Sequence, residues 1–266
     1  MDQPTPTLSP LVDTHAHLDF TDFDFDRDAV NERAAEAGLE SIITIGIEPA
    51  DWQKTLDIAN SYDNARPALG IHPNSADQTN EQTLSDLTVL CRRQANGKRI
   101  VAIGETGLDF YREYVPHDVQ KQSFRAQLDL ARELNLPVII HNRDAHADVL
   151  AILKNDGGGT RGVMHSFSGD LAFALECIER GYMISLAGPV TFRNAADKHQ
   201  IAQNVPLEHL LIETDCPFLT PEPFRGRRNE PSYVQYVARA IARIREISYE
   251  EVAQTTTANA RRLFGF

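Results

Sequence analysis

The sequence has 266 residues, of which 42% are hydrophobic and 24% are charged, as is typical of a globular protein. A formal net charge of −12 argues against a protein that coats nucleic acid by neutralising its phosphates, but allows an enzyme that acts on a phosphate ester at one site. Three scattered cysteines without C-x-x-C spacing argue against a disulfide framework and favour a reducing compartment, which predicts a cytoplasmic protein.

The first ten residues, MDQPTPTLSP, are rich in proline and threonine. They lack the basic and apolar regions of a signal peptide, so we expect a flexible leader over residues 1–10. No apolar run along the chain reaches the length needed to span a bilayer. We expect one domain over residues 11–266, since α/β barrels often fill this length as a single domain.

Strand-like segments alternate with helix-length segments along this domain. The expected strands are 11–18, 41–47, 65–73, 99–110, 136–143, 162–167, 182–187 and 209–219. Helical spacing of apolar residues recurs between them, for example in 28–38, 118–135 and 170–181. Each of these three begins at an aspartate, as an N-cap would.

About eight strand–helix units predict an α/β fold, a single (β/α)8 TIM barrel. Residues 249–265 predict a closing C-terminal helix. An open, doubly wound sheet is the competing architecture, but no G-x-G-x-x-G follows the first strand, which weakens a dinucleotide-binding version.

Imidazole and carboxylate side chains occur at the carboxyl ends of the predicted strands. They are His15 and His17 on the first strand, His72 on the third, Glu105 on the fourth, His141 on the fifth, His165 on the sixth and Asp215 on the eighth. The carboxyl ends of barrel strands meet at one rim, so we expect these groups to converge. Clustering them without a cation would be electrostatically unfavourable, which predicts a metal site.

Nitrogen and oxygen ligands without a thiolate suit Zn, Mn, Fe or Mg. One carboxylate can bind two metals through its two oxygens, and Glu105 is the candidate bridge. The predicted ligands would then be His15, His17 and Asp215 for one cation, and His141 and His165 for the other. Asp215 can also accept a proton from the attacking water, so Glu105 and Asp215 are the predicted catalytic residues.

Other positions are open to two interpretations. Asp13 shares a strand face with His15 and His17, and would either orient one of them or lie in a polar layer of the barrel. The aspartates between residues 19 and 28 lack the glycine and terminal glutamate of a calcium loop, so we interpret them as negative charge before a helix N-terminus.

A basic segment, FRGRRNEP, follows the eighth strand. Its arginines, Arg225, Arg227 and Arg228, would either clamp a phosphate or balance charge in a solvated loop. We assign Arg225 and Arg227, together with His72, to substrate binding.

With these features the chain resembles the TatD family of metal-dependent deoxyribonucleases, within the amidohydrolase-like barrels. The resemblance covers nearly everything after the leader and rests on DTHAHLD, GIHP, IGETGLDFY, QKQSFRAQLDLARELNLPVIIHNRDA, HSFSG, ETDCPFLTP with RGRRNEP, and TTTANARRLFG. It implies a TIM barrel, a divalent-metal site and hydrolysis of nucleic-acid phosphodiesters. The family's metal-ligand positions are matched by His15, His17, Glu105, His141, His165 and Asp215.

The resemblance also implies 3'–5' exonuclease activity on DNA. Many binuclear amidohydrolases bridge their metals with a carboxylated lysine on the fourth strand. This sequence has Glu105 there and no lysine nearby, which favours the nuclease-like branch over dihydroorotase- or lactonase-like enzymes.

The prediction is therefore a monomeric metal-dependent deoxyribonuclease that trims single-stranded DNA ends with two divalent cations, Mg, Mn or Zn. The alternative is a small-molecule amidohydrolase or lactonase that uses the same metal site. A non-enzymatic scaffold that binds nucleic acid or a protein is disfavoured by the acidic composition and the intact ligand set.

Overall fold

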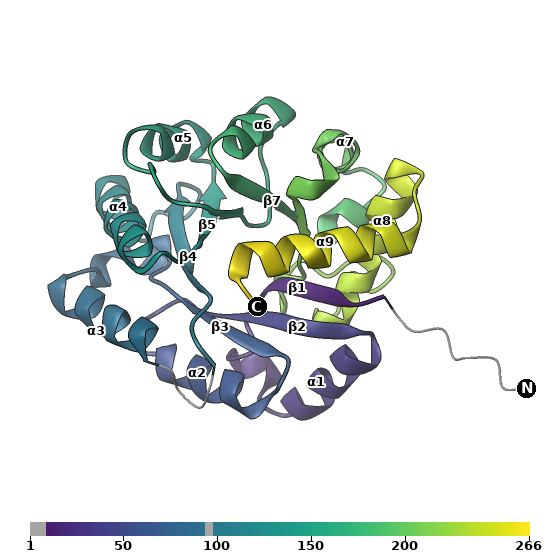
Figure 1. The fold of residues 1–266 in the computed structure, drawn as a ribbon, viewed down its shortest axis with the longest axis horizontal. Helices are drawn as coiled ribbons and strands as arrows, with labels where there is room; N and C mark the ends of the chain where they lie inside the picture. Colours follow the sequence, from purple (N-terminus) through teal and green to yellow (C-terminus); the bar gives the residue numbers. More distant parts are fainter. Residues whose placement is uncertain (1–8, 94–97) are drawn as a thin grey trace, which may run out of the picture.

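Eight parallel strands form one sheet that curls into a barrel in the computed structural model, which describes residues 9–93 and 98–266 (Figure 1). The strands follow the chain in spatial order and are β1 (Leu11–Ala16), β2 (Leu39–Gly46), β3 (Ala65–Leu69), β4 (Ala102–Asp109), β5 (Val138–Arg143), β6 (Gly162–Met164), β7 (Tyr182–Leu186) and β8 (Leu210–Ile212). The predicted (β/α)8 barrel is confirmed.

Helices connect the strands and surround the barrel (Figure 1). They are α1 (Arg27–Glu36), α2 (Trp52–Ser61), α3 (Glu81–Arg92), α4 (His117–Leu134), α5 (His146–Asn155), α6 (Leu171–Glu179), α7 (Ala196–Asn204), α8 (Val234–Arg245) and α9 (Tyr249–Phe264). Of the predicted leader, residues 1–8 lie outside the described residues. Over residues 9–93 and 98–266, the helices are too short or too polar to cross a membrane.

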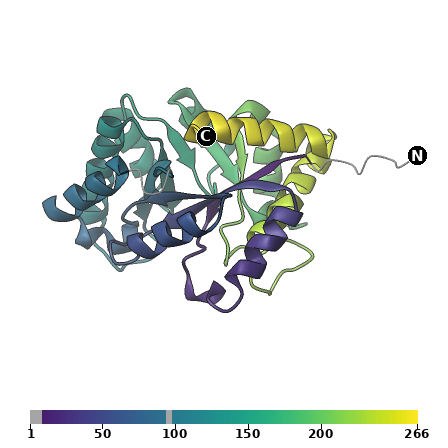
Figure 2. The same cartoon turned by 60° about the horizontal axis from the view of Figure 1, so that its bottom comes forward.

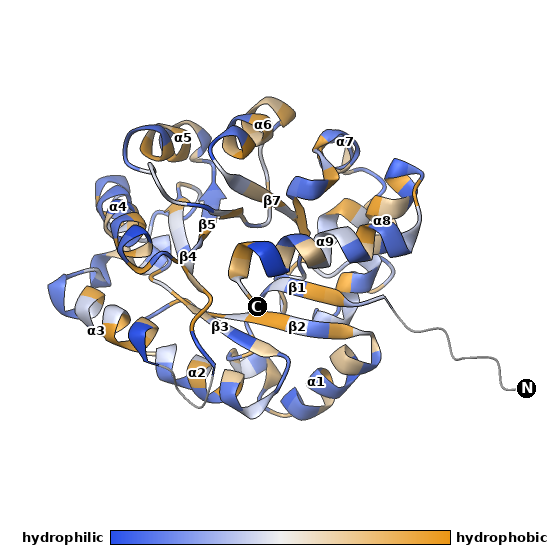
Figure 3. Cartoon of the chain, viewed as in Figure 1, coloured by the Kyte–Doolittle hydropathy of each residue, from blue (hydrophilic) through white to orange (hydrophobic). Residues whose placement is uncertain are grey.

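The apolar face of α4 illustrates how a helix joins the core. Phe124, Leu128 and Ala131 recur at helical spacing and are fully buried. The helix ends where Asn135 adopts a left-handed conformation, with φ of 52°. Figure 3 shows the same division across the molecule, with hydrophobic residues on the strands and on the inner faces of the helices.

The barrel closes between β1 and β8, just beyond the last residue of β8. The backbone N–H of Asp215 donates to the carbonyl of His15 at 2.8 Å, and the N–H of His17 donates to the carbonyl of Cys216 at 2.9 Å. These bonds form a seam that holds His15, His17 and Asp215 side by side. The same hydrogen bonds therefore close the barrel and place three predicted ligands next to one another.

The closing helix α9 covers the N-terminal end of the barrel. The Asn259 amide donates to the carbonyls of Leu207 and Leu210, both at 2.8 Å, and the Thr257 hydroxyl donates to the carbonyl of Pro10 at 2.8 Å. In Figure 2, α9 lies along the top, and the purple loop that follows β1 projects on the opposite side. Since α9 covers one end, the C-terminal rim is the end left open for a site.

Candidate metal centre

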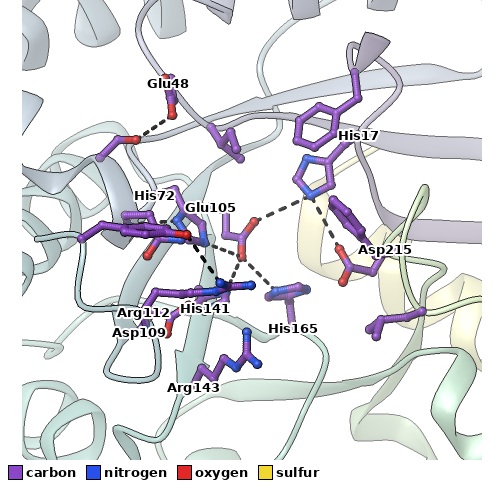
Figure 4. A pocket seen from close by; sticks show the side chains of 17 residues that line it. His17, Glu48, His72, Glu105, Asp109, Arg112, His141, Arg143, His165 and Asp215 are labelled. Carbon is purple, nitrogen blue, oxygen red and sulfur yellow. Dashed lines mark hydrogen bonds and ion pairs between the residues drawn. The ribbon is translucent and has the colours of Figure 1, made fainter. Parts of the chain in front are cut away.

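The strand-end histidines and carboxylates meet at the C-terminal rim of the barrel (Figure 4). All of them except His15, which is completely buried, line a cavity of about 600 Å³. Four of them lie in the loops after β1, β3, β6 and β8, not within the strands as the sequence suggested; these are His17, His72, His165 and Asp215. β8 ends at Ile212, and Asp215 follows three residues later with its backbone in the left-handed region, with φ of 56°.

Glu105 lies at the centre of the cluster, and each of its oxygens faces a different pair of histidines. Oε1 is 2.7 Å from Nδ1 of His141 and 2.9 Å from Nε2 of His165. Oε2 is 3.3 Å from Nε2 of His15 and 3.9 Å from Nε2 of His17. This is the arrangement expected of a carboxylate that bridges two cations.

The backbone just before Glu105 requires glycine. Gly104 has φ of +140°, a conformation that residues with a side chain rarely adopt. A Cβ there would lie 2.6 Å from the carbonyl oxygen of Ile139 on the neighbouring strand. Gly104 thus lets β4 pass close to β5 and sets the position of the Glu105 carboxylate between the histidine pairs.

The first histidine pair forms a compact group with Asp215. Nε2 of His15 and Nε2 of His17 are 3.2 Å apart, and they lie 3.7 Å and 3.6 Å from Oδ1 of Asp215. Tetrahedral ligands at about 2.0–2.2 Å from zinc lie about 3.4 Å from one another. The spacing of these donor atoms therefore fits ligands arranged around one cation.

The second pair, His141 and His165, faces Oε1 of Glu105. His72 is close by, with Nε2 3.6 Å from the same oxygen, so distance alone would also allow it as a ligand. Its Nδ1, however, accepts a hydrogen bond from the backbone N–H of Asn74 at 3.0 Å. In the neutral ring Nε2 then carries the proton, which makes it a donor and not a metal ligand. Burial, the largest influence, lowers the pKa of His72 to about 3 and keeps the ring neutral.

Two buried carboxylates orient the second pair from behind. Nε2 of His141 lies 3.2 Å from Oδ2 of Asp109, and Nδ1 of His165 lies 3.2 Å from Oε1 of Glu213. A ring that donates to an outer carboxylate presents its other nitrogen, with a free lone pair, to a metal. Sequence reasoning missed both supports. Asp109 lies on the same strand face as Glu105, and Glu213 directly follows the end of β8, where barrel strands carry their functional groups, which is the signal that could have found them.

The carboxylates of the cluster stay ionised despite their burial. Burial opposes ionisation of Glu105, but the charge of His165 and the hydrogen bond from His141 outweigh it, and the pKa of Glu105 is held well below the usual value. For Asp215, burial is likewise opposed, by the hydrogen bond from His17 and the nearby His165, and the net effect lowers its pKa. Four imidazoles and two carboxylates, without a thiolate, are a ligand set that fits divalent cations.

The remaining polar residues of β1 and its loop have structural partners. Asp13 accepts hydrogen bonds from the backbone N–H of Thr214 at 2.9 Å and from its hydroxyl at 2.5 Å. It therefore supports the β1–β8 seam, and its burial raises its pKa to about 8. In the acidic loop, Asp24 binds Arg27 and Asp26 binds Arg228.

The basic segment after β8 lies outside the cavity lining. The Arg228 guanidinium forms a two-pronged ion pair with Asp26, both contacts at 2.7 Å. The Arg225 guanidinium lies over the Phe192 ring, 4.4 Å from its centroid, and that of Arg227 lies 6.0 Å from the centroid of Phe224. The two permanent cations among the described residues that do line the cavity are Arg112 and Arg143.

The chain is similar to known proteins over nearly its whole length. The family model described as TatD related DNase matches residues 12–265. A Bacillus subtilis protein named uncharacterized metal-dependent hydrolase YabD is 46% identical over 255 residues, covering 96% of this chain and 98% of its own. The protein named 3'-5' ssDNA/RNA exonuclease TatD from Erwinia amylovora is 35% identical, covering 96% and 100%. The solved structure of the TatD homologue YjjV from Escherichia coli superposes with a TM-score of 0.89 at 34% identity, covering 96% and 98%.

Proposed function

The chain belongs to the TatD-related DNase family of metal-dependent hydrolases, and from this premise we propose that it hydrolyses phosphodiester bonds of single-stranded nucleic acid. The mode we propose is trimming of DNA from the 3' end. A relative that is 35% identical over the full length carries the name of a 3'–5' exonuclease of single-stranded DNA and RNA, which supports this choice.

The observation that carries the proposal is the position of Glu105. Its two oxygens face separate histidine pairs, and this supports two cations at one rim, held by His15, His17, Glu105, His141, His165 and Asp215. Divalent cations bound there would lower the pKa of a water molecule and neutralise charge on the phosphoryl oxygens of the substrate.

The protein's own groups have distinct roles in this proposal. The Asp215 carboxylate, ionised and partly exposed to the cavity, accepts the proton of the attacking water at Oδ1 or Oδ2. The Nε2–H of His72 donates a hydrogen bond to a substrate oxygen, since Nδ1 is already occupied. Phe20 and Phe218, whose ring centroids are 5.9 Å apart, form one wall of the mouth and limit access of bulk water.

We propose that Arg225 and Arg227 contact the substrate only outside the cavity, where an extended nucleic-acid strand would leave it. Both side chains are exposed on the loop after β8. The three cysteines are free, which supports the reducing compartment we propose, the cytoplasm.

The test is a metal-dependence series on single-stranded DNA labelled at the 5' end, with a parallel panel of lactones and cyclic amides. The proposal predicts a ladder of shortened 5'-labelled products that requires added Mg²⁺, Mn²⁺ or Zn²⁺ and is abolished by chelation. Turnover of a lactone or cyclic amide without cleavage of DNA would instead establish the small-molecule alternative.

A further inference from the structure

Resting on the proposed function, we propose that Arg112, Arg143 and Tyr114 form a subsite for the nucleotide next to the cleaved linkage. The two arginines bind the phosphate of that nucleotide, and Tyr114 stacks on its base. All three side chains line the cavity, and Figure 4 shows Arg112 and Arg143 beside Asp109 and His141, which lie on β4 and β5.

Charge is the first reason for this assignment. The chain has a net charge of −12, and the cavity wall also contains Glu48, Asp109 and the carboxylates of the metal centre. Several arginines elsewhere in the molecule bind acids, as Arg33 binds Glu230 at 2.6 Å. Within residues 9–93 and 98–266, no carboxylate oxygen lies within 4 Å of the Arg112 or Arg143 guanidinium. The N–H donors of these two arginines, which lie beside the proposed cleavage site, are therefore available to bind a phosphate of the substrate.

Both guanidinium groups contact the ring of Tyr111. The Cζ atom of Arg143 lies 3.7 Å from the centroid of the Tyr111 ring, and that of Arg112 lies 5.6 Å from it. A cation–π contact places a guanidinium group without using a carboxylate as its partner. The N–H donors of both arginines therefore remain for an oxyanion ligand.

The loop that carries Arg112 is anchored to the metal centre itself. Oδ1 of Asp109 accepts the backbone N–H groups of Tyr111 at 3.0 Å and Arg112 at 2.9 Å, while its Oδ2 faces His141. The buried amide of Gln120 holds the loop from below, by accepting from the N–H of Asp109 at 2.8 Å and donating to the carbonyl of Val115 at 2.9 Å. The position of Arg112 is therefore fixed relative to a predicted ligand.

Arg143 is placed by the strand it ends. It follows His141 by two residues on β5, so both side chains point to the same face of the sheet. Two residues of strand advance about 6.6 Å, a distance similar to the spacing of neighbouring phosphates in an extended nucleic-acid strand. With the cleaved phosphate at the metal centre, the next phosphate falls beside Arg143.

Exposed aromatic surface completes the subsite. Tyr114 is 68% exposed and lines the cavity, and its hydroxyl lies 3.4 Å from Nη1 of Arg112. A large aromatic ring left in solvent beside two arginines is the arrangement by which proteins bind a base and its phosphate in a single strand.

The experiment combines a substrate change with a protein change. A 5'-labelled oligonucleotide is compared with one whose linkage next to the 3'-terminal linkage is a neutral methylphosphonate. For the wild-type protein, we expect the methylphosphonate to lower kcat/KM about 100-fold. On the fully charged substrate, we expect the double variant Arg112→Gln/Arg143→Gln to lower kcat/KM by a similar factor. Together the two changes cost little more than either alone, because they remove the same contact.

Two further readouts separate the subsite from the metal centre. Hydrolysis of bis(p-nitrophenyl) phosphate, which has no neighbouring phosphate, stays within about two-fold of wild type in the double variant. In the double variant, chelator-treated protein binds a fluorescent oligonucleotide more weakly. The slope of log K against log salt concentration also becomes shallower by about 0.7, the value for one phosphate contact. Arg243→Gln removes the charge of an exposed arginine on the outer helix α8 and controls for loss of positive charge away from the cavity.

We expect Tyr114→Ala to lower kcat/KM for the oligonucleotide about 10-fold, because the base loses its stacking partner. With an abasic neighbouring nucleotide, Tyr114→Ala and wild type should have the same kcat/KM, and Tyr114→Phe should retain wild-type activity on the normal substrate. Fully additive effects of methylphosphonate and double variant, or equal losses with Arg243→Gln, would overturn the subsite while leaving the nuclease proposal intact. A wild type that cleaves the aryl diester but neither binds nor cleaves the oligonucleotide would overturn the proposed function and the subsite with it.

Discussion

Replacement of Glu105 by glutamine keeps the shape of the side chain and removes its charge. Because each Glu105 oxygen faces its own histidine pair, at 2.7 and 2.9 Å on one side and 3.3 and 3.9 Å on the other, we expect both cation sites to weaken together. If each lost carboxylate contact costs what a buried charged hydrogen bond contributes, about 1.5–3 kcal/mol, affinity falls about 10- to 100-fold at each site.

The assay is isothermal titration of chelator-treated protein with Mn²⁺ or Zn²⁺. Wild type should take up two ions per chain, and Glu105→Gln should show lower affinity for both. Glu48→Gln is the matched control, because Glu48 lines the same cavity but accepts its hydrogen bond from Ser75, at 2.7 Å. Loss of one site with the other intact would refute the bridging role, as would unchanged binding of both ions.

Three more outcomes follow from the same contacts. Glu213→Gln should lower kcat about 10- to 100-fold with an unchanged circular dichroism spectrum, since it releases Nδ1 of His165; wild-type kcat would contradict this. Burial lowers the pKa of His165, but Glu105 and Glu213 outweigh it and raise that pKa well above normal, so the metal-free ring holds a proton at pH 7. Metal binding must displace that proton, so the affinity for the divalent cation should rise from pH 6 to pH 8. Titration in two buffers of different ionisation enthalpy measures the proton release, and a metal affinity that does not change with pH would contradict the prediction. Thr214→Val should lower the free energy of unfolding in urea by about 1–3 kcal/mol, because it removes a hydrogen bond from buried Asp13; an unchanged midpoint would argue against the seam.

The barrel and the convergence of the seven strand-end groups could be predicted from the sequence, because both follow from local patterns. Runs of apolar residues indicate the strands, and apolar residues with a period of 3.6 indicate the helices. The carboxyl ends of the strands then indicate where the rim of the barrel lies. The division of ligands between two cations stays a prediction. His15 and His17 both lie near Oδ1 of Asp215, at 3.7 and 3.6 Å, but the donor atoms of His15, His165 and Asp215 also lie close enough together to share one cation.

Features that depend on contacts between distant loops could not be predicted in this way. Arg228 is paired with Asp26, 202 residues away, whereas Arg143 has no acidic neighbour within ion-pair distance in the described chain. The sequence shows Arg225, Arg227 and Arg228 as a basic segment and gives no comparable emphasis to Arg112 or Arg143. Likewise, only the backbone N–H of Asn74 on Nδ1 reveals that His72 is a donor.

Anomalous diffraction from crystals grown with Mn²⁺ or Zn²⁺ tests most directly whether Glu105 bridges two cations. We predict two peaks about 3.5–4 Å apart, one beside His15 and His17, the other beside His141 and His165, with a Glu105 oxygen on each. A single peak, or a pair that does not contact Glu105, would contradict the account.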